Sequence, residues 1–232
     1  MRHLTVPGVS LVLLAGCAAP PTQRIDGQAL SAVRGQSVAT TQRTKADFTT
    51  LSPGNAMFGM LGAVAGISEG KRIVTENKVE DPANAIAAAL ARSLQTGQGA
   101  QVVPQPLAID TDDVARIANA AKGKARFIVD VKTTTWSSGY FPFDWTHYRV
   151  MYAANARLID TETQKVLAQG TCRQVPETNA GAPTSSELFG QGAARLKTII
   201  AAHAQTCLDS LRRDMLGVAE GDAPASPAVA AQ

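Results

Sequence analysis

The side chains of this 232-residue chain that could do chemistry are few, and two cysteines are the clearest. Cys172 ends the strand-like segment 166–172, and Cys207 lies on an apolar helical stripe that includes Leu196 and Leu211. Both thiols are therefore predicted to face the seam between a sheet and a helix. In an oxidising compartment they would form a structural disulfide that closes a loop of about 35 residues. The alternative is two buried free thiols, and no Cys-x-x-Cys spacing indicates redox chemistry.

The histidines and carboxylates do not form a recognisable catalytic or metal-binding pattern. His147 and His203 are isolated in the sequence, and His203 shares the apolar stripe of Cys207, which is typical of a core histidine. Asp112-Asp113 and Ser185-Ser186-Glu187 are interpreted as helix-start residues. A nucleophile elbow and a phosphate-binding loop are both missing from the sequence. We therefore expect neither a metal nor another cofactor, and no enzyme; a site assembled from scattered polar residues is the alternative.

The N-terminal residues have the pattern of a secretory signal that ends in a cysteine. Arg2 supplies a positive start, and residues 4–14 are an apolar stretch far shorter than the roughly 20 residues of a membrane span. Leu14-Ala15-Gly16-Cys17 follows and resembles the lipobox of bacterial lipoproteins. The resemblance implies that residues 1–16 are removed and that Cys17 is acylated, which anchors the protein stably in a membrane leaflet. An ordinary signal peptide with an incidental cysteine is the alternative.

The lipoprotein resemblance also implies a location. Aspartate after the acylated cysteine tends to retain such proteins at the inner membrane, and Ala18 stands here instead. We therefore expect a lipid anchor in the bacterial outer membrane and a domain that faces the periplasm. Loss of Arg2 with the signal leaves 21 basic and 19 acidic residues, a net charge of +2. This balance argues against nucleic acid as a partner.

The rest of the chain alternates short helices and strands. Residues 17–35 are predicted to be a flexible tether, 36–217 a single domain, and 218–232 a disordered tail rich in Ala, Pro and Ser. Within the domain, the expected elements in order are a strand over 36–42, a helix from Asp81-Pro82, a short strand at 102–103, a helix from Thr111, strands over 127–132, 148–158 and 166–172, and a long helix over 184–216.

These elements predict an α+β fold. The last three strands form an antiparallel meander, and one or two further strands extend the sheet. The helices are expected on one face of the sheet, and the long C-terminal helix closes the domain. The pattern is similar to the periplasmic α+β domains of lipoproteins in secretion and envelope assembly, of which the curli-secretion lipoprotein is one.

A glycine-rich segment over 54–70 is the first candidate contact region. Gly59, Gly62, Gly66 and Gly70 have spacings of three, four and four, which predicts a smooth ridge along one side of a helix. The uncharged residues 54–68 would extend only about 22 Å as a helix, too short to span a bilayer. Three interpretations remain open: a segment packed on the sheet, a segment in or dipping into the membrane, and a helix that pairs with another protein or another copy.

A cluster of aromatic residues is the second candidate contact region. Seven of the eleven aromatic residues lie between positions 136 and 152. Tyr148 and Tyr152 alternate with polar residues and are predicted to be core. Phe141, Phe143 and Trp145 surround an expected hairpin tip, where they would either contact a protein, glycan or lipid, or fold back as a satellite core.

Together these patterns predict a membrane-anchored envelope lipoprotein that acts as a binding or structural subunit. The membrane, through the lipid, and an envelope protein or a second copy are the expected partners. The first alternative is a subunit of an oligomeric secretion or pore assembly in the outer membrane. The second alternative is an enzyme whose site the sequence does not reveal.

Overall fold

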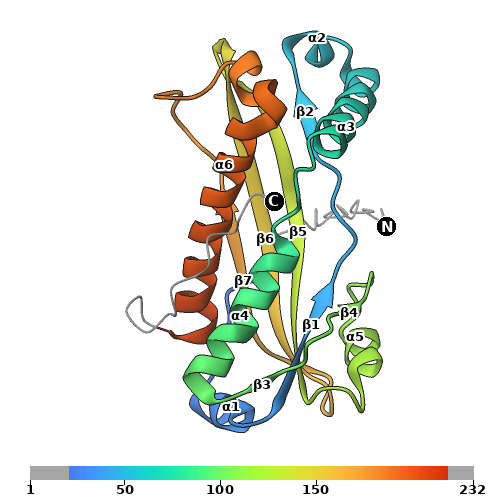
Figure 1. Cartoon of the computed structure of the whole chain (residues 1–232), viewed down its shortest axis with the longest axis vertical. Helices are drawn as coiled ribbons and strands as arrows, with labels where there is room; N and C mark the ends of the chain where they lie inside the picture. Colours follow the sequence, from blue (N-terminus) through green and yellow to red (C-terminus); the bar gives the residue numbers. More distant parts are fainter. Residues whose placement is uncertain (1–20, 219–232) are drawn as a thin grey trace, which may run out of the picture.

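The structure, a computed structural model, describes residues 21–218 (Figure 1). Cys17, the predicted signal peptide and residues 219–232 of the predicted tail lie outside the described residues. The elements in chain order are α1 (Gly27–Val33), β1 (Ser37–Gln42), β2 (Thr49–Leu51), α2 (Pro53–Ala56), α3 (Gly59–Glu76), α4 (Ala83–Gln98), β3 (Gln101–Val102), β4 (Leu107–Ala108), α5 (Val114–Ala121), β5 (Phe127–Phe141), β6 (Asp144–Asp160), β7 (Lys165–Gln174), α6 (Ser185–Leu211) and the π-turn η1 (Arg212–Leu216).

The centre of the fold is one mixed sheet of seven strands. β5, β6 and β7 form the predicted antiparallel meander, in which Ala154 of β6 pairs with Thr133 of β5 and Cys172 of β7. β1 and β2 both pair with β5 in parallel, at its beginning and near its end. The prediction of a purely antiparallel sheet is therefore wrong. Helices connect β1 and β2 to β5 along the chain. Such a helical crossover returns the chain to the same end of the sheet, so β5 runs parallel to β1 and β2.

Helices cover both faces of the sheet and not one face alone (Figure 1). α4 and α6 pack on the face that carries Phe127 and Val129, where the main core lies. α5 packs on the opposite face, against Ile128 and Ile159. The continuous apolar run at the start of β5 explains why both faces are covered, because a strand that is buried on both faces has no polar side to expose.

The helix starts follow the capping chemistry of the sequence with one exception. A carboxylate oxygen of Asp81 accepts a hydrogen bond from the amide of Ala83 at the start of α4 (3.0 Å), and Asp113 caps α5 by accepting from the amide of Arg116 (2.9 Å). Asp112 does not cap α5. Its carboxylate instead forms ion pairs with basic side chains across the sheet surface.

The long C-terminal helix is interrupted near its beginning. Thr184 and Glu187 form a reciprocal capping box at its start, and residues 190–193 then leave the helical conformation. Gln191 and Ala193 have positive φ angles of 51° and 56°, which side chains with a Cβ rarely adopt. From residue 194 α6 continues to Leu211, where the chain widens into the π-helical η1, and Gly217 ends η1 in a left-handed conformation.

The N-terminal segment is more ordered than the flexible tether predicted over 17–35. Gln23 pairs with Gln169 at the outer edge of β7. Asp26 caps α1, which contacts α4 and buries Val33 completely. Residues 21–35 therefore belong to the folded domain, and only residues 18–20 separate the predicted lipid site, Cys17, from it.

Candidate functional site

Large exposed apolar side chains of the described residues gather at the end of the sheet where β5 turns into β6, the upper end in Figure 1. They form two patches. The first, the α2–α3 patch, comprises Leu51, Met57, Phe58, Met60, Leu61, Val64 and Ile67. The second, the hairpin patch, comprises Phe143 and Trp145, which are 102% and 67% exposed. Such concentration of exposed apolar surface is typical of a contact site.

The glycine ridge explains why α3 has its apolar side outward. Gly62, Gly66 and Gly70 lie against backbone carbonyl groups of the segment 48–55, which includes β2. A Cβ atom at Gly62 would lie 1.7 Å from the nearest carbonyl oxygen, at Gly66 2.5 Å and at Gly70 1.9 Å. No other residue type fits these positions without movement of the backbone. The ridge thus holds α3 tightly against the edge strand of the sheet.

The two sides of α3 differ in what they contact. The three ridge glycines are buried inside the protein, which corresponds to the interpretation of a segment packed on the sheet. Gly59 is the first residue of α3, has a φ of 54° and has no neighbour at its Cβ position. The opposite side of α3 carries Met60 and Val64, 89% and 64% exposed. This apolar stripe is the part of the segment that is free to meet a partner.

The aromatic cluster likewise separates into core and surface. Phe141 is only 4% exposed and lies under the guanidinium group of Arg149, 5.6 Å from the ring centre. Phe143 forms the two-residue turn with Pro142 and points away from the protein. Trp145 is held beside Tyr140, with ring centres 6.2 Å apart. The tip therefore exposes two of the three aromatic residues that the sequence singled out.

The remaining aromatic residues of the cluster are structural. Tyr148 and Tyr152 are buried, in agreement with their strand alternation. Trp136 packs edge-on against Phe48, with ring centres 5.3 Å apart. These contacts connect the upper half of β5 to the segment that leads into β2, and so they fix the position of the α2–α3 patch.

A groove of about 590 Å³ runs beside the α2–α3 patch, between α3, β2, β6 and the first turn of α6. Thr50, Ser68 and Glu69 give it polar walls, and Tyr148 and Phe189 form its apolar floor. Arg72 also lines the groove, and its guanidinium group is paired with Glu69 and Glu76.

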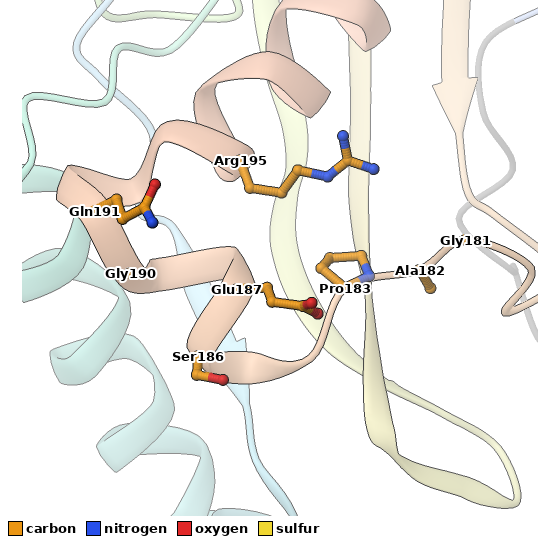
Figure 2. Close-up of a pocket in the computed structure, with 8 residues that line it drawn as sticks. All are labelled: Gly181, Ala182, Pro183, Ser186, Glu187, Gly190, Gln191 and Arg195. Atoms are coloured by element: carbon orange, nitrogen blue, oxygen red, sulfur yellow. The ribbon is translucent and has the colours of Figure 1, made fainter.

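A second, open depression of about 630 Å³ lies over the interrupted start of α6 (Figure 2). Figure 2 shows Glu187 and Arg195 on either side of it, with Pro183 at its wall. Glu187 is already bonded to the amide and hydroxyl of Thr184, and these hydrogen bonds lower the pKa of Glu187. The polar side chains that line this depression, Ser186, Glu187, Gln191 and Arg195, are exposed to solvent.

Charged groups on the open sheet face form ion pairs with one another. Asp130 is buried between Arg43 and Arg157. Lys132 pairs with Asp112, and that hydrogen bond lowers the pKa of Asp112. Asp112, Asp130, Lys132 and Arg157 border a cavity of about 370 Å³. Their ion pairs connect β1, β5 and β6, so the network has a structural role in joining strands.

The two cysteines form the predicted disulfide, which joins β7 to α6. Both are buried in the main core. His203 is half-buried and its Nε2 donates to the carbonyl oxygen of Val150 (3.1 Å), as expected of a core histidine. His147 lies beside Asp144, 2.7 Å from Nδ1 to Oδ2. Asn179, together with His147, lowers the pKa of Asp144 to about 2.

Within residues 21–218, no group of three or more His, Cys, Asp or Glu side chains has the arrangement of a metal site. The helices in the same range are each too short or too polar to cross a membrane.

The sequence matches no known protein-family model, and no curated protein matches it. Structure comparison gives partial similarity to three bacterial proteins. They are the PelC dodecamer from Paraburkholderia phytofirmans (11% identity, 85% of this chain and 94% of that chain, TM-score 0.36), the lipoprotein GNA1162 from Neisseria meningitidis (14%, 72% and 98%, 0.31) and the LpoB C-terminal domain from Salmonella enterica (11%, 61% and 84%, 0.28). At these TM-scores the similarity carries no functional conclusion.

Sequence reasoning did not identify Met57, Phe58, Met60, Leu61 and Val64 as the exposed members of the glycine-rich segment. Their apolar character favoured burial, and the glycines attracted the contact hypothesis. A signal was present, because a helix that is apolar all round must have a partner on every side. The glycine side is matched to backbone, and among residues 21–218 nothing covers the other side.

Proposed function

We propose that this chain is a lipid-anchored envelope protein whose domain acts as a binding or structural subunit. The lipobox-like residues 14–17 support acylation of Cys17 and a site of action beside the outer membrane, with the domain in the periplasm. The observation that carries the binding role is the gathering of the exposed large apolar side chains at one end of the domain. Solvent exposure of so many apolar groups is unfavourable, so a partner that covers them stabilises the protein.

The architecture holds this end surface in a fixed conformation, which supports a role in binding. The ridge glycines lock α3 on β2, and the disulfide locks α6 on β7. Both patches are therefore carried by elements with fixed positions. A surface held in this way loses little conformational entropy when it binds.

Photo-crosslinking in cells tests the proposed role. A photoreactive amino acid at position 60 or 143 should give a specific crosslink in the envelope, whereas the same group at the exposed Thr198 on the outer side of α6 should not. Metabolic labelling with a fatty acid analogue should modify the chain, and Cys17→Ser should abolish the label. Equal crosslinking from all three positions, or an unlabelled native chain, would contradict the proposal.

Self-assembly is the second candidate function. The exposed side chains of the two patches amount to on the order of 1,000 Å², comparable with the ~800 Å² that each partner buries in a stable complex. Size measurement in mild detergent distinguishes this candidate: a particle larger than a monomer that Met60→Ser and Phe143→Ser dissociate would support an assembly. A monomer at all concentrations would exclude it.

A further inference from the structure

We infer that the α2–α3 patch and the hairpin patch are a second membrane contact, which inserts shallowly into a lipid bilayer beside the acylated N-terminus. This inference deepens the proposed function and depends on it for the nearby membrane. It commits to lipid, and not to a second copy or another protein, as the material that covers the end surface.

The chemistry of the α2–α3 patch matches hydrocarbon. Between Asp47 and Glu69 the chain has no charged residue. The outward stripe of α3, which is formed by Met60, Leu61, Val64 and Ile67, has no polar side chain among its members. Protein interfaces of this size usually contain a hydrogen bond for every 100–200 Å² or so, and this stripe offers no side chain for one. From Gly62, whose amide donates to the carbonyl oxygen of Phe58 (3.4 Å), the α-helical backbone of α3 bonds within the helix, which suits a lipid environment. The first turn has no side-chain cap and would lie at the hydrated level of the head groups.

The hairpin patch adds side chains suited to the interface between lipid and water. Phe143 is fully exposed at the turn, and Trp145 follows on the same tip. Indole rings are enriched at the level of lipid head groups, where the apolar ring can be buried while its N–H stays hydrated. The phenyl ring of Phe143 has no polar group and is suited to insertion below that level. Asp144 between them does not project as a free acid, because it is bonded to His147 and Asn179.

The two patches lie at one end of the molecule but on separate elements (Figure 1). The polar groove beside α3, with Thr50, Ser68 and Glu69 in its wall, borders the first patch. A bilayer accommodates two separate apolar projections at the same level, since lipid chains flow around each of them. A protein partner would need a surface with two apolar hollows and polar groups between them.

The short tether restricts the orientation in which this surface can reach the membrane. Gln23 is fixed on Gln169, which pairs with Arg157, and β6 extends from there to Asp144 at the hairpin. At about 3.3 Å per residue this distance is roughly 40 Å. The chain from Cys17 to Pro21 can extend by only about 14 Å. If the lipid on Cys17 and the end surface occupy the same leaflet, the strands must lie close to the membrane plane, with the sheet along the bilayer.

The test uses the mature chain, residues 17–232, produced without the predicted signal residues and with Cys17→Ser. This chain has neither the acyl anchor nor the apolar signal segment, so any binding to vesicles must come from the protein surface. We expect this chain to float with phosphatidylcholine vesicles. Trp136→Phe in the same background leaves Trp145 as the sole tryptophan, whose emission should shift to shorter wavelength and be quenched by brominated acyl chains.

Two sets of substitutions identify the surface. Met60→Ser with Val64→Ser, and separately Phe143→Ser with Trp145→Ser, should each weaken vesicle partitioning at least tenfold, because several inserted apolar groups are lost. Leu167→Ser removes a half-buried apolar side chain of β7 away from this end and should leave partitioning unchanged. Far-ultraviolet circular dichroism verifies that each variant is folded.

Failure of the Cys17→Ser chain to bind vesicles, or equal binding by all variants, would overturn the inference. A lipid-independent dimer that dissociates on Met60→Ser would also overturn it, in favour of a second copy. An unacylated Cys17 in cells would instead contradict the proposed function and leave the vesicle result intact. The two proposals can therefore fail separately.

Discussion

The guanidinium group of Arg43 and the carboxylate of Asp130 form a bidentate pair in the interior of the protein, with Nε to Oδ1 at 2.8 Å and Nη2 to Oδ2 at 2.9 Å. Arg157 approaches the same carboxylate from β6, and its Nη2 lies 2.6 Å from Oδ2. Arg43 directly follows β1, and Asp130 lies on β5. The pair therefore holds the parallel junction between β1 and β5, which no turn or hairpin fixes.

Asp130→Asn should destabilise the protein strongly. The substitution removes the buried anion that two guanidinium groups share and leaves Arg43 only its pair with the exposed Asp112; breaking a buried pair in this way costs about 3–5 kcal/mol. Asp112→Asn is the matched control, because the Asp112 side chain is 62% exposed and its pairs contribute at most about 1 kcal/mol. Urea unfolding of the three chains measures both effects, and equal midpoints for the two variants would refute the assigned role.

The stability of the protein should also fall on mild acidification because of His203. Burial lowers the pKa of His203, and the hydrogen bond to the Val150 carbonyl offsets this only in part. A histidine with a depressed folded-state pKa stabilises the fold above its unfolded pKa of about 6.5, and this stabilisation is lost as the pH falls through the folded value. His203→Gln should flatten the dependence of the unfolding free energy on pH below that point. An unchanged slope would show that other groups cause it.

The ridge glycines should tolerate no Cβ. Gly66→Ala places a methyl group 2.5 Å from the carbonyl oxygen of Thr50, and overpacking of this kind costs about 1–3 kcal/mol. Gly97→Ala, in the helix α4, has open space at its Cβ and should stabilise by about 0.5–1 kcal/mol. Thermal unfolding distinguishes the two, and the opposite signs are the diagnostic result. Similar changes in the two variants would mean that α3 does not rest on β2 through its glycines.

The parts of the fold that depend on neighbouring residues could be predicted from the sequence, and the parts that depend on distant residues could not. The β5–β6–β7 meander and the disulfide were predictable, since alternation and a polar turn specify neighbouring antiparallel strands. The parallel pairing of β1 and β2 with β5 was not, because it depends on contacts across almost 90 residues such as Arg43 with Asp130. The upper half of β5 was also missed: the polar run from Thr133 to Ser138 lacks alternation and is a strand because β2 and β6 pair with it.

Phe141 and Phe143 show that the local sequence also could not predict which side chains of the candidate site are exposed. The sequence gives both the same neighbourhood, yet Phe141 is buried and Phe143 is exposed. Phe141→Ser should therefore lower stability by about 3 kcal/mol or more, as expected for loss of a buried ring. Phe143→Ser should leave the unfolding free energy within about 0.5 kcal/mol of the parent. Chemical unfolding measures both, and a large loss in the Phe143 variant would show that the tip folds back on the core.

The disulfide should contribute much of the stability of the C-terminal half. Cys172 and Cys207 are 35 residues apart, and on the chain-entropy model a cross-link of that span stabilises by about 4 kcal/mol. The chain with Cys172→Ala and Cys207→Ala should therefore unfold at clearly lower denaturant concentration than the oxidised parent. Dithiothreitol should lower the midpoint of the parent toward that of the double variant and leave the double variant unchanged. A parent that is insensitive to the reductant, although its free thiols appear on titration, would show that packing between β7 and α6 holds this region without the covalent bond.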